Sequence, residues 1–568
     1  MIPGDFLPID LRLADFLAGA ASAEKDAVRH AVRWLSRAVR LGNVCLPLSE
    51  CGDVSVGPAL RASGVVGEPG SALPLILDAS GRLYLHRFRR YEEEVARFLR
   101  EGAVAPGAPV DREILDDGLA RLFKPEGGAG PDHQCEAAVR AVSRRVSVVS
   151  GGPGTGKTTT VVKMLALLLE QAGGKPLEIA LAAPTGKAAD RLKKSVAERV
   201  DSLDVDPRVR EQIPREALTI HRLLGAGLGG RFRHDSENPL PYDVVVVDEA
   251  SMIDLPMMAR LVAAMPGGSR LILLGDKDQL VSIEAGTVFA DICAAKGPFS
   301  ECVSVLTRNY RFGDASPIAL LSSAIRDGRG EEALDRLRSG GGDVAWAELP
   351  DPDAMERFLL PRVHSRFLPF LAAATPEEAF EAFGRFRILS AHREGAYGVS
   401  GLNEAVEKIL AREGKIRKER SEHYRGRPIL IVRNDHALRL YNGDTGIVLP
   451  DPSDGGKLKA FFSPTDERHG GKGGVPTQPY RTVLLPRLPE HETAWATTVH
   501  KSQGAEFDEV LLVLGPSDSG HVTRELLYTG ITRAKTRVTV ASKPEPFTDA
   551  VVRSVGRSSG LSDLLAKV

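Results

Sequence analysis

The feature that most constrains the fold of this chain is a glycine-rich loop between an apolar strand and an apolar helix. Residues 150–159 read Ser-Gly-Gly-Pro-Gly-Thr-Gly-Lys-Thr-Thr, which matches the phosphate-binding pattern G-x-x-x-x-G-K-T in full. Residues 145–150 before the loop are rich in valine, and residues 161–169 after it are almost wholly apolar. Glycine lets the backbone approach phosphate oxygens, and the helix start presents free N–H groups to them. The sequence therefore predicts an α/β domain that binds a nucleoside triphosphate.

Individual residues of this loop have expected contacts. Lys157 is expected to reach the β- and γ-phosphate oxygens, and the Thr158 hydroxyl is expected to ligate Mg²⁺. The residues predicted to contact the nucleotide are Gly151, Gly152, Pro153, Gly154, Thr155, Gly156, Lys157, Thr158 and Thr159.

A second apolar strand supplies the carboxylates that such a site needs. Residues 243–249 read Asp-Val-Val-Val-Val-Asp-Glu. Four consecutive valines are typical of a strand covered on both faces, as in a parallel sheet. Asp248 is expected at the carboxyl edge of the sheet, where it can hold Mg²⁺ through water, and Glu249 is placed to polarise the attacking water. An Asp-Glu pair alone is usually a solvated strand end, but downstream of the phosphate loop it predicts hydrolysis.

Two glutamines have a possible role at the nucleotide. The strand at residues 271–274 is followed by Gly-Asp-Lys-Asp-Gln, so Gln279 can sense the γ-phosphate, unless these are ordinary turn residues. Gln134, just ahead of the first strand, can form paired hydrogen bonds with the adenine edge, although a lone glutamine is more often on the surface.

Two arginines far downstream indicate a second domain. Residues 306–312 read Leu-Thr-Arg-Asn-Tyr-Arg-Phe, where Tyr310 can stack on a base and Arg311 can offset phosphate charge. Arg533 follows in the segment 527–535. Both arginines are too distant in sequence to belong to the phosphate-loop domain. Arginines that reach a nucleotide from a second domain couple hydrolysis to domain closure.

This ordered series of motifs resembles the superfamily 1 helicases, two-domain motors that move along single-stranded DNA. More narrowly, it resembles the RecD family, subunits of the RecBCD helicase–nuclease (exodeoxyribonuclease V). The narrower resemblance covers nearly the whole chain and rests on the motifs at residues 183–189, 306–312, 500–507, 433–446 and 42–48.

The resemblance implies a function and a role for each motif residue. It implies an ATP-dependent DNA helicase that uses ATP and Mg²⁺ and moves 5′→3′. Gln134 and Tyr310 would hold adenine, and Glu506 would contact the ribose. The residues implied in hydrolysis or in sensing the γ-phosphate are Lys157, Thr158, Asp248, Glu249, Gln279, Arg311 and Arg533. Those implied along the DNA path are Thr185, Lys187, His221, Thr498 and His500. One departure is that residues 280–284 lack the base-stacking aromatic of motors that move in the opposite direction.

Partners follow from the same resemblance. It implies single-stranded DNA and duplex ends as ligands, and a heterotrimer with RecB-like and RecC-like subunits. No Asp…(Glu/Asp)-x-Lys cluster of a nuclease is found, so nuclease activity is assigned to a partner chain. Three alternatives stay open. The first is a stand-alone RecD-like helicase, which the short N-terminal region disfavours. The second is an RNA motor, because backbone contacts and base stacking do not distinguish RNA from DNA. The third is a nucleotide-gated binding protein, which the carboxylate pair and the distant arginines disfavour.

Composition limits how DNA is bound. The chain has 568 residues, a net charge of −1 and a pI near 6.9, so cations that bind DNA must be confined to a channel. Basic runs at residues 86–90 and 415–420 are either local DNA-binding patches or solvated faces of the protein. The first run can equally be interpreted as an interface with another subunit. Five cysteines without C-x-x-C spacing argue against a zinc site and fit a reducing cytoplasm. Neither a signal peptide nor a membrane span is indicated.

The fold class predicted is α/β, with two RecA-like parallel-sheet domains. A largely helical N-terminal domain, implied to bind partners, is expected at residues 1–122, with helices over 6–17 and 27–41 and a hairpin across Ser80-Gly81. A linker at 124–131 leads to the first RecA-like domain. The remaining predicted segments are the first RecA-like domain at 132–300, the second at 303–424 and 491–568, and a β insertion at 425–490. The insertion is interpreted as an SH3-like barrel, a shape the RecD family also has there, with a loop at 466–474.

Overall fold

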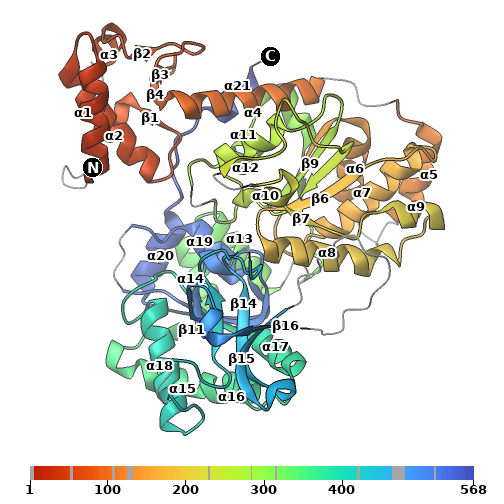
Figure 1. Ribbon diagram of the computed structural model, residues 1–568, viewed down its shortest axis with the longest axis vertical. Helices are drawn as coiled ribbons and strands as arrows, with labels where there is room; N and C mark the ends of the chain where they lie inside the picture. Colours follow the sequence, from red (N-terminus) through yellow and green to blue (C-terminus); the bar gives the residue numbers. More distant parts are fainter. Residues whose placement is uncertain are drawn as a thin grey trace. The chain divides into compact units, whose positions relative to one another are not determined.

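In the computed structural model, the chain folds into two compact units (Figure 1). One comprises Met1–Pro184, Leu192–Thr307 and Gly556–Val568, and the other comprises Thr185–Arg191 and Arg308–Val555. The predicted linker at 124–131 and loop at 466–474 lie outside the described residues. No helix within the described part of the chain is long and apolar enough to cross a membrane. The described residues are 6–51, 56–104, 109–123, 132–227, 230–282, 284–311, 313, 316–418, 422–435, 437–463, 480–516 and 520–567.

A parallel sheet forms the centre of the first unit. Its order is β10-β5-β9-β8-β6-β7, and each neighbouring pair runs parallel. Apolar, β-branched side chains cover both faces, so nearly every residue of the central strands is buried, as the valine runs predict. The strands are β5 (Val146–Gly151), β6 (Ile179–Ala183), β7 (Leu218–Thr219), β8 (Val244–Val247), β9 (Arg270–Gly275) and β10 (Val303–Leu306).

Helices cover the faces of this sheet. Several of them start at a capping side chain. The side chain of Asp254, for example, accepts a hydrogen bond from Met257 N at 2.7 Å at the start of α11. The helices of this part of the chain are α6 (His133–Ser143), α7 (Lys157–Gln171), α8 (Gly186–Val200), α9 (Pro207–Gln212), α10 (Ile220–Leu223), α11 (Leu255–Ala263) and α12 (Val288–Cys293).

The N-terminal part of the first unit has its own small core. Helices α1 (Pro8–Ala20) and α2 (Lys25–Arg40) pack on each other and on a four-stranded sheet of order β1-β4-β3-β2. The predicted hairpin is confirmed, because β3 (Leu75–Leu77) pairs antiparallel with β4 (Arg82–Leu85). The other elements here are β1 (Cys45–Pro47), α3 (Val56–Ala62), β2 (Val66–Gly67), α4 (His86–Val104) and α5 (Arg112–Leu122).

The last helix of the chain, α21 (Leu561–Ala566), belongs to the first unit, although the sequence analysis placed 491–568 in the second domain. A buried carboxylate explains the difference. Glu92 on α4 is fully buried and accepts hydrogen bonds from Gly560 N at 2.8 Å and from Ser559 Oγ at 2.9 Å. Burial raises the pKa of Glu92 to about 7, against the lowering effect of these hydrogen bonds. An ion pair of 2.6 Å between Arg82 and Asp563 adds a second link.

A second correction concerns β10. The sequence analysis began the second domain at Val303, but β10 pairs in parallel with β5 at the edge of the first sheet. The backbone N–H and C=O groups of a strand form hydrogen bonds with a partner strand that can be distant in sequence. The local sequence pattern does not show which strand that partner is. The first unit accordingly continues to Thr307.

The second unit contains a parallel sheet of its own. Its order is β11-β20-β19-β12-β18, with parallel pairing throughout, as predicted for a second α/β domain. Its core surrounds Trp495, which is fully buried and donates through Nε1 to Tyr424 Oη at 2.9 Å. The strands are β11 (Val344–Glu348), β12 (Phe386–Ser390), β18 (Ala496–Thr498), β19 (Phe507–Val513) and β20 (Ala534–Ser542). The helices are α13 (Pro317–Arg326), α14 (Gly330–Ser339), α15 (Met355–Arg362), α16 (Leu368–Leu371), α17 (Pro376–Arg385), α18 (Val399–Arg412), α19 (Arg524–Ile531) and α20 (Pro544–Val552).

An antiparallel sheet lies within the sequence of the second unit, where the β insertion was predicted. Its order is β16-β15-β14-β13-β17, and the predicted turn contains Gly443 at a φ of 95°. The last strand lies beyond the predicted boundary of 490, because Thr493 pairs with Ile429. The strands are β13 (Pro428–Ile431), β14 (Thr445–Asp451), β15 (Lys457–Phe462), β16 (Arg481–Leu484) and β17 (His491–Thr493).

Candidate nucleotide site

The phosphate loop connects β5 to α7 in the first unit. Gly154 and Gly156 have φ values of 83° and 79°, in the left-handed region that glycine adopts without strain. Lys157 is the first residue of α7, and its Nζ donates to the carbonyl oxygens of Gly151 at 2.5 Å and Gly152 at 3.1 Å. The ammonium group is therefore held against the loop whose shape and helix dipole favour a phosphate.

The loop also closes on itself at Thr155. The Thr155 hydroxyl donates to the Gly152 carbonyl oxygen at 2.8 Å. A Cβ on Gly151 would lie 2.5 Å from the Thr155 Oγ1 and 3.0 Å from Leu306 Cβ. A side chain at position 151 would thus push apart the loop and strand β10, which explains the glycine there.

Gln134 is held beside this loop. It lies in the first turn of α6, where the Asp132 side chain accepts hydrogen bonds from the backbone N–H groups of Gln134 and Cys135. Its Nε2 donates to the Thr155 carbonyl oxygen at 3.0 Å. The structure therefore brings Gln134 to the phosphate loop, and its contact with adenine stays a prediction.

The carboxylate pair lies at the carboxyl edge of the same sheet. Asp248 follows β8, and its backbone N–H donates to the Ala182 carbonyl oxygen at 2.9 Å. Glu249 has a φ of 53°, one of three positive values for non-glycine residues in the described part of the chain. Such a conformation costs of order 1–3 kcal/mol and is concentrated at functional sites. Because parallel strands end at one edge, these carboxylates and the phosphate loop share the edge where α/β proteins bind ligands.

Between them, at the end of β9, Gln279 is anchored to a carboxylate that the sequence analysis did not assign. Asp276 and Gln279 are 2% and 4% exposed, and Gln279 Nε2 donates to Asp276 Oδ2 at 3.1 Å. The neighbouring backbone N–H of Lys277 donates to Ser150 Oγ at 3.3 Å, next to the phosphate loop. Asp276 positions the glutamine. Its place in the motif Gly-Asp-x-x-Gln is the sequence feature that could have identified it.

A charged cluster in the second unit joins three of the predicted residues. Arg311 Nη2 donates to both carboxylate oxygens of Glu506, at 2.8 and 3.0 Å. Arg533 is 1% exposed and donates to the carbonyl oxygens of Thr529 and Ala505, each at 3.2 Å. Burial alone would raise the pKa of Glu506, but the neighbouring arginines hold it below its ordinary value. Glu506 is therefore an ionised partner of Arg311 here; the ribose contact that the resemblance implies stays a prediction.

Tyr310 next to this cluster suits a stacking role. Tyr310 is 46% exposed, and the Arg308 guanidinium carbon lies 5.1 Å from the centroid of its ring. Stacking an exposed aromatic on a base requires only an accessible ring face.

The residues predicted along DNA lie at strand ends or helix starts. Thr185 accepts a hydrogen bond from Ala188 N at 3.3 Å at the start of α8, and burial lowers the pKa of Lys187 to about 8. Thr498 accepts from Lys501 N at 3.2 Å. His500 begins the short 3₁₀ turn His500–Ser502. The His221 ring centroid lies 6.0 Å from that of Phe232. The contact of these five residues with DNA stays a prediction.

The donors at the phosphate edge fit a magnesium ion. Among the described residues, no three His, Cys, Asp or Glu side chains form a cluster that could hold a metal by itself. Mg²⁺ usually keeps several waters and is held by one or two carboxylates together with substrate phosphates. The Thr158 hydroxyl and the Asp248 carboxylate supply two oxygen ligands of this kind, and water and phosphate oxygens would supply the others.

The fold and this site define a P-loop nucleoside triphosphatase, and comparisons with known proteins place it more narrowly. Family models match residues 134–285 (AAA domain), 493–541 (UvrD-like helicase C-terminal domain) and 4–58 (RecBCD enzyme subunit RecD, N-terminal domain). The solved structure of Bacteroides Pif1 bound to ssDNA aligns with 73% of this chain and 93% of that chain, at 18% identity and a TM-score of 0.38.

Curated relatives resemble the chain over nearly its whole length. The RecBCD enzyme subunit RecD of Mycolicibacterium smegmatis is 40% identical over 98% of this chain and 96% of the relative. The RecBCD enzyme subunit RecD of Haemophilus influenzae is 35% identical over 85% and 80%. The ATP-dependent RecD2 DNA helicase of Deinococcus radiodurans is 30% identical over 83% of this chain but 57% of the relative. The chain belongs to the RecD family of superfamily 1 helicases.

Proposed function

We propose that this chain is an ATP-dependent DNA helicase that acts as the RecD subunit of a RecBCD-type helicase–nuclease, which processes double-strand DNA ends for recombinational repair. The observation that carries this function is the complete phosphate loop with Lys157 and the strained Glu249 at one sheet edge, in a chain 40% identical to RecD proteins over nearly its full length. Family membership alone supports the 5′→3′ direction.

The catalytic roles follow from the chemistry of each side chain. Lys157 and the loop N–H groups bind the phosphates of ATP, and Glu249 accepts a proton from the attacking water. Gln279, held by Asp276, responds to the γ-phosphate. Mg²⁺, when bound by Thr158 and Asp248, supplies positive charge to the phosphate oxygens.

By family membership, Arg311 and Arg533 are proposed to sense the loss of the γ-phosphate. Because an ionised Glu506 already holds Arg311, a change in the position of Arg311 also changes the loop before β19. This link gives hydrolysis a route to the segment containing Thr498 and His500, which we propose to grip the strand. Thr185 and Lys187, predicted in the first RecA-like domain, belong to the same unit as this segment and are proposed to grip the strand with it.

The domains have distinct proposed tasks. Residues 132–300, together with β10, are proposed as the ATP-binding RecA-like domain, and the sheet of the second unit as the other RecA-like domain. The insertion predicted at 425–490, together with β17, is proposed to be SH3-like. Five free cysteines are compatible with the cytoplasm as its compartment.

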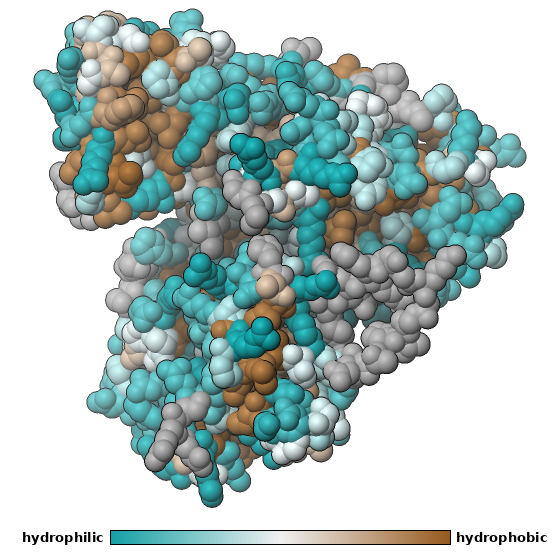
Figure 2. Space-filling view, viewed as in Figure 1, coloured by the Kyte–Doolittle hydropathy of each residue, from teal (hydrophilic) through white to brown (hydrophobic). Residues whose placement is uncertain are grey.

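The N-terminal domain, residues 1–122, is proposed to contact RecB-like or RecC-like subunits. Ile9 and Phe16, two turns apart on α1, are 60% and 73% exposed. Figure 2 shows hydrophobic residues gathered over α1 and α2. An exposed apolar patch of this kind marks a protein interface.

DNA-stimulated ATP hydrolysis tests the proposed function. Purified full-length chain is mixed with ATP and either poly-deoxythymidine or poly-uridine, and phosphate release is measured at several salt concentrations. We expect at least about tenfold stimulation by the DNA, weakening as salt rises because counterion release drives phosphate contacts. Equal stimulation by RNA would favour an RNA motor, and no stimulation by either polymer would favour a nucleotide-gated binding protein.

A further inference from the structure

A groove separate from the nucleotide site runs along one face of α4 in the first unit. It has a volume of about 920 Å³ and is closed on its other side by Pro298, Phe299 and the last helix, α21. The lining positions on α4 recur at three- and four-residue spacing, which places them on one face of the helix. They run from Arg90 to Val104, about 21 Å at 1.5 Å per residue.

The floor of the groove is apolar and its last turn is open. Phe299 and Leu565 are each 1% exposed, and Ala96 is 3% exposed, so they form a packed floor. Val104, the last residue of α4, is 78% exposed. A packed apolar floor beside an exposed aliphatic side chain is suited to receiving apolar side chains from a partner.

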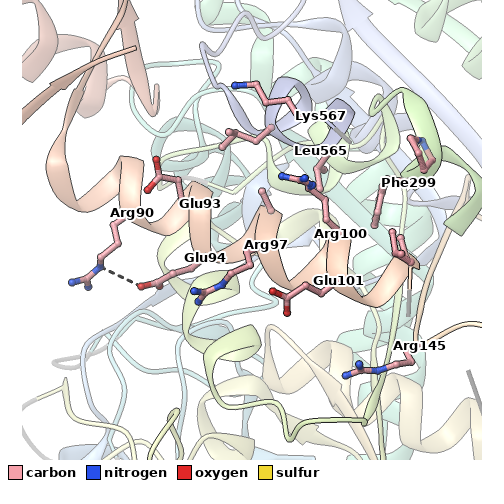
Figure 3. Close-up of a pocket in the computed structure, with 15 residues that line it drawn as sticks. Arg90, Glu93, Glu94, Arg97, Arg100, Glu101, Arg145, Phe299, Leu565 and Lys567 are labelled. Atoms are coloured by element: carbon pink, nitrogen blue, oxygen red, sulfur yellow. Dashed lines mark ion pairs between the residues drawn. The ribbon is translucent and has the colours of Figure 1, made fainter. Parts of the chain in front are cut away.

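The rim of the groove is cationic. Two lining carboxylates already have partners: Glu93 pairs with Arg89 at 2.7 Å, and Glu94 with Arg90 at 3.3 Å. Within the described part of the chain, the other charged lining residues make no ion pair; they are Arg97, Arg100, Arg145, Lys567 and Glu101. Of these five charged lining residues, four are cations and one is a carboxylate. Figure 3 shows Arg97 and Glu101 on the edge of α4 that Arg90 and Glu94 begin, and Arg100 on the other side toward Leu565.

We propose that this groove docks an acidic amphipathic helix of a partner protein. Leucine or phenylalanine side chains of that helix fill the floor, and flanking glutamates or aspartates pair with Arg97, Arg100 and Lys567 on the rim. The length of the α4 face matches a helix of about 14 residues. A DNA strand fits less well, because Glu93, Glu94 and Glu101 border a floor without exposed aromatic faces for stacking.

A peptide of matched chemistry tests the proposal on the full-length chain. The probe is a fluorescein-labelled helix of about 14 residues, with leucine every three or four positions and glutamate on both sides of that stripe. A second probe has lysine in place of every glutamate, and a third is a single-stranded oligonucleotide. Fluorescence anisotropy measures Kd for each. We expect the acidic peptide to bind at least about tenfold more tightly than the basic peptide.

Variants locate the binding. The double variant Arg97→Glu/Arg100→Glu is expected to weaken the acidic peptide at least about tenfold and to gain affinity for the basic peptide, since the rim charge is reversed. The matched control, Arg208→Glu/Arg215→Glu, changes two exposed arginines elsewhere in the first unit and is expected to leave Kd unchanged. Both variants should keep ATP hydrolysis, which verifies folding.

The proposal is overturned if the acidic peptide does not bind, or if it binds the double variant as tightly as the original chain. It is also overturned if the oligonucleotide, rather than the peptide, loses affinity in Arg97→Glu/Arg100→Glu. None of these outcomes depends on the proposed helicase function, because the probes and the groove are separate from the nucleotide site.

Discussion

Replacing Lys157 with alanine is expected to lower kcat/KM for ATP hydrolysis at least about 100-fold. The Lys157 ammonium is held 2.5 Å from the Gly151 carbonyl oxygen in the phosphate loop, and its loss removes the cation that this loop is proposed to offer the γ-phosphate. A 100-fold loss corresponds to about 2.7 kcal/mol of transition-state stabilisation. Steady-state phosphate release with saturating single-stranded DNA measures it.

A nearby lysine provides the control for this prediction. Lys175 follows the end of α7 and is exposed, so Lys175→Ala removes the same charge outside the loop. It is expected to hydrolyse ATP at the original rate. If Lys157→Ala retained kcat/KM within about tenfold of the original chain, a difference of about 1.4 kcal/mol, the assignment of Lys157 would be wrong.

The second large effect is expected for Glu249→Gln, which should bind ATP normally but lose at least about 100-fold in kcat. An amide at this position keeps the shape of the side chain but cannot accept the proton of the attacking water. Nucleotide binding is measured with a fluorescent ATP analogue, and turnover by rapid chemical quench.

The matched control here is Glu237→Gln, an exposed glutamate of the same unit. Its kcat is expected to stay unchanged. Glu249 would lose its role as the base if kcat in Glu249→Gln fell less than about tenfold. A parallel loss of ATP affinity would instead indicate that the left-handed backbone at Glu249 had been disturbed.

Local patterns predicted much of the fold. The valine-rich runs predicted buried parallel strands, and the glycine-rich loop predicted the connection from β5 to α7. Boundaries that depend on distant pairing were wrong. Val303 begins a strand of the first sheet, and Gly560 donates to the buried Glu92 on α4. Such contacts join residues far apart in sequence, so no local periodicity reveals them.

The site divides in the same way. Gln134 and Lys157 lie in continuous motifs, and the structure places both at the phosphate loop. The pairing of Arg311 with Glu506 could not be predicted, because it joins two motifs through the fold of the second unit. The role of Asp276 could not be predicted, because an aspartate in a turn can have many roles, and only its hydrogen bond to Gln279 shows which one it has.

Strand separation tests most directly whether ATP hydrolysis in this chain drives movement along DNA. Fluorescently labelled duplexes with a single-stranded 5′ tail, a 3′ tail or no tail are mixed with the full-length chain, with and without its proposed partner subunits, and ATP starts the reaction. We expect the chain alone to separate the 5′-tailed duplex and Lys157→Ala to leave it paired. Equal separation by Lys157→Ala, or separation of only the 3′-tailed duplex, would contradict it.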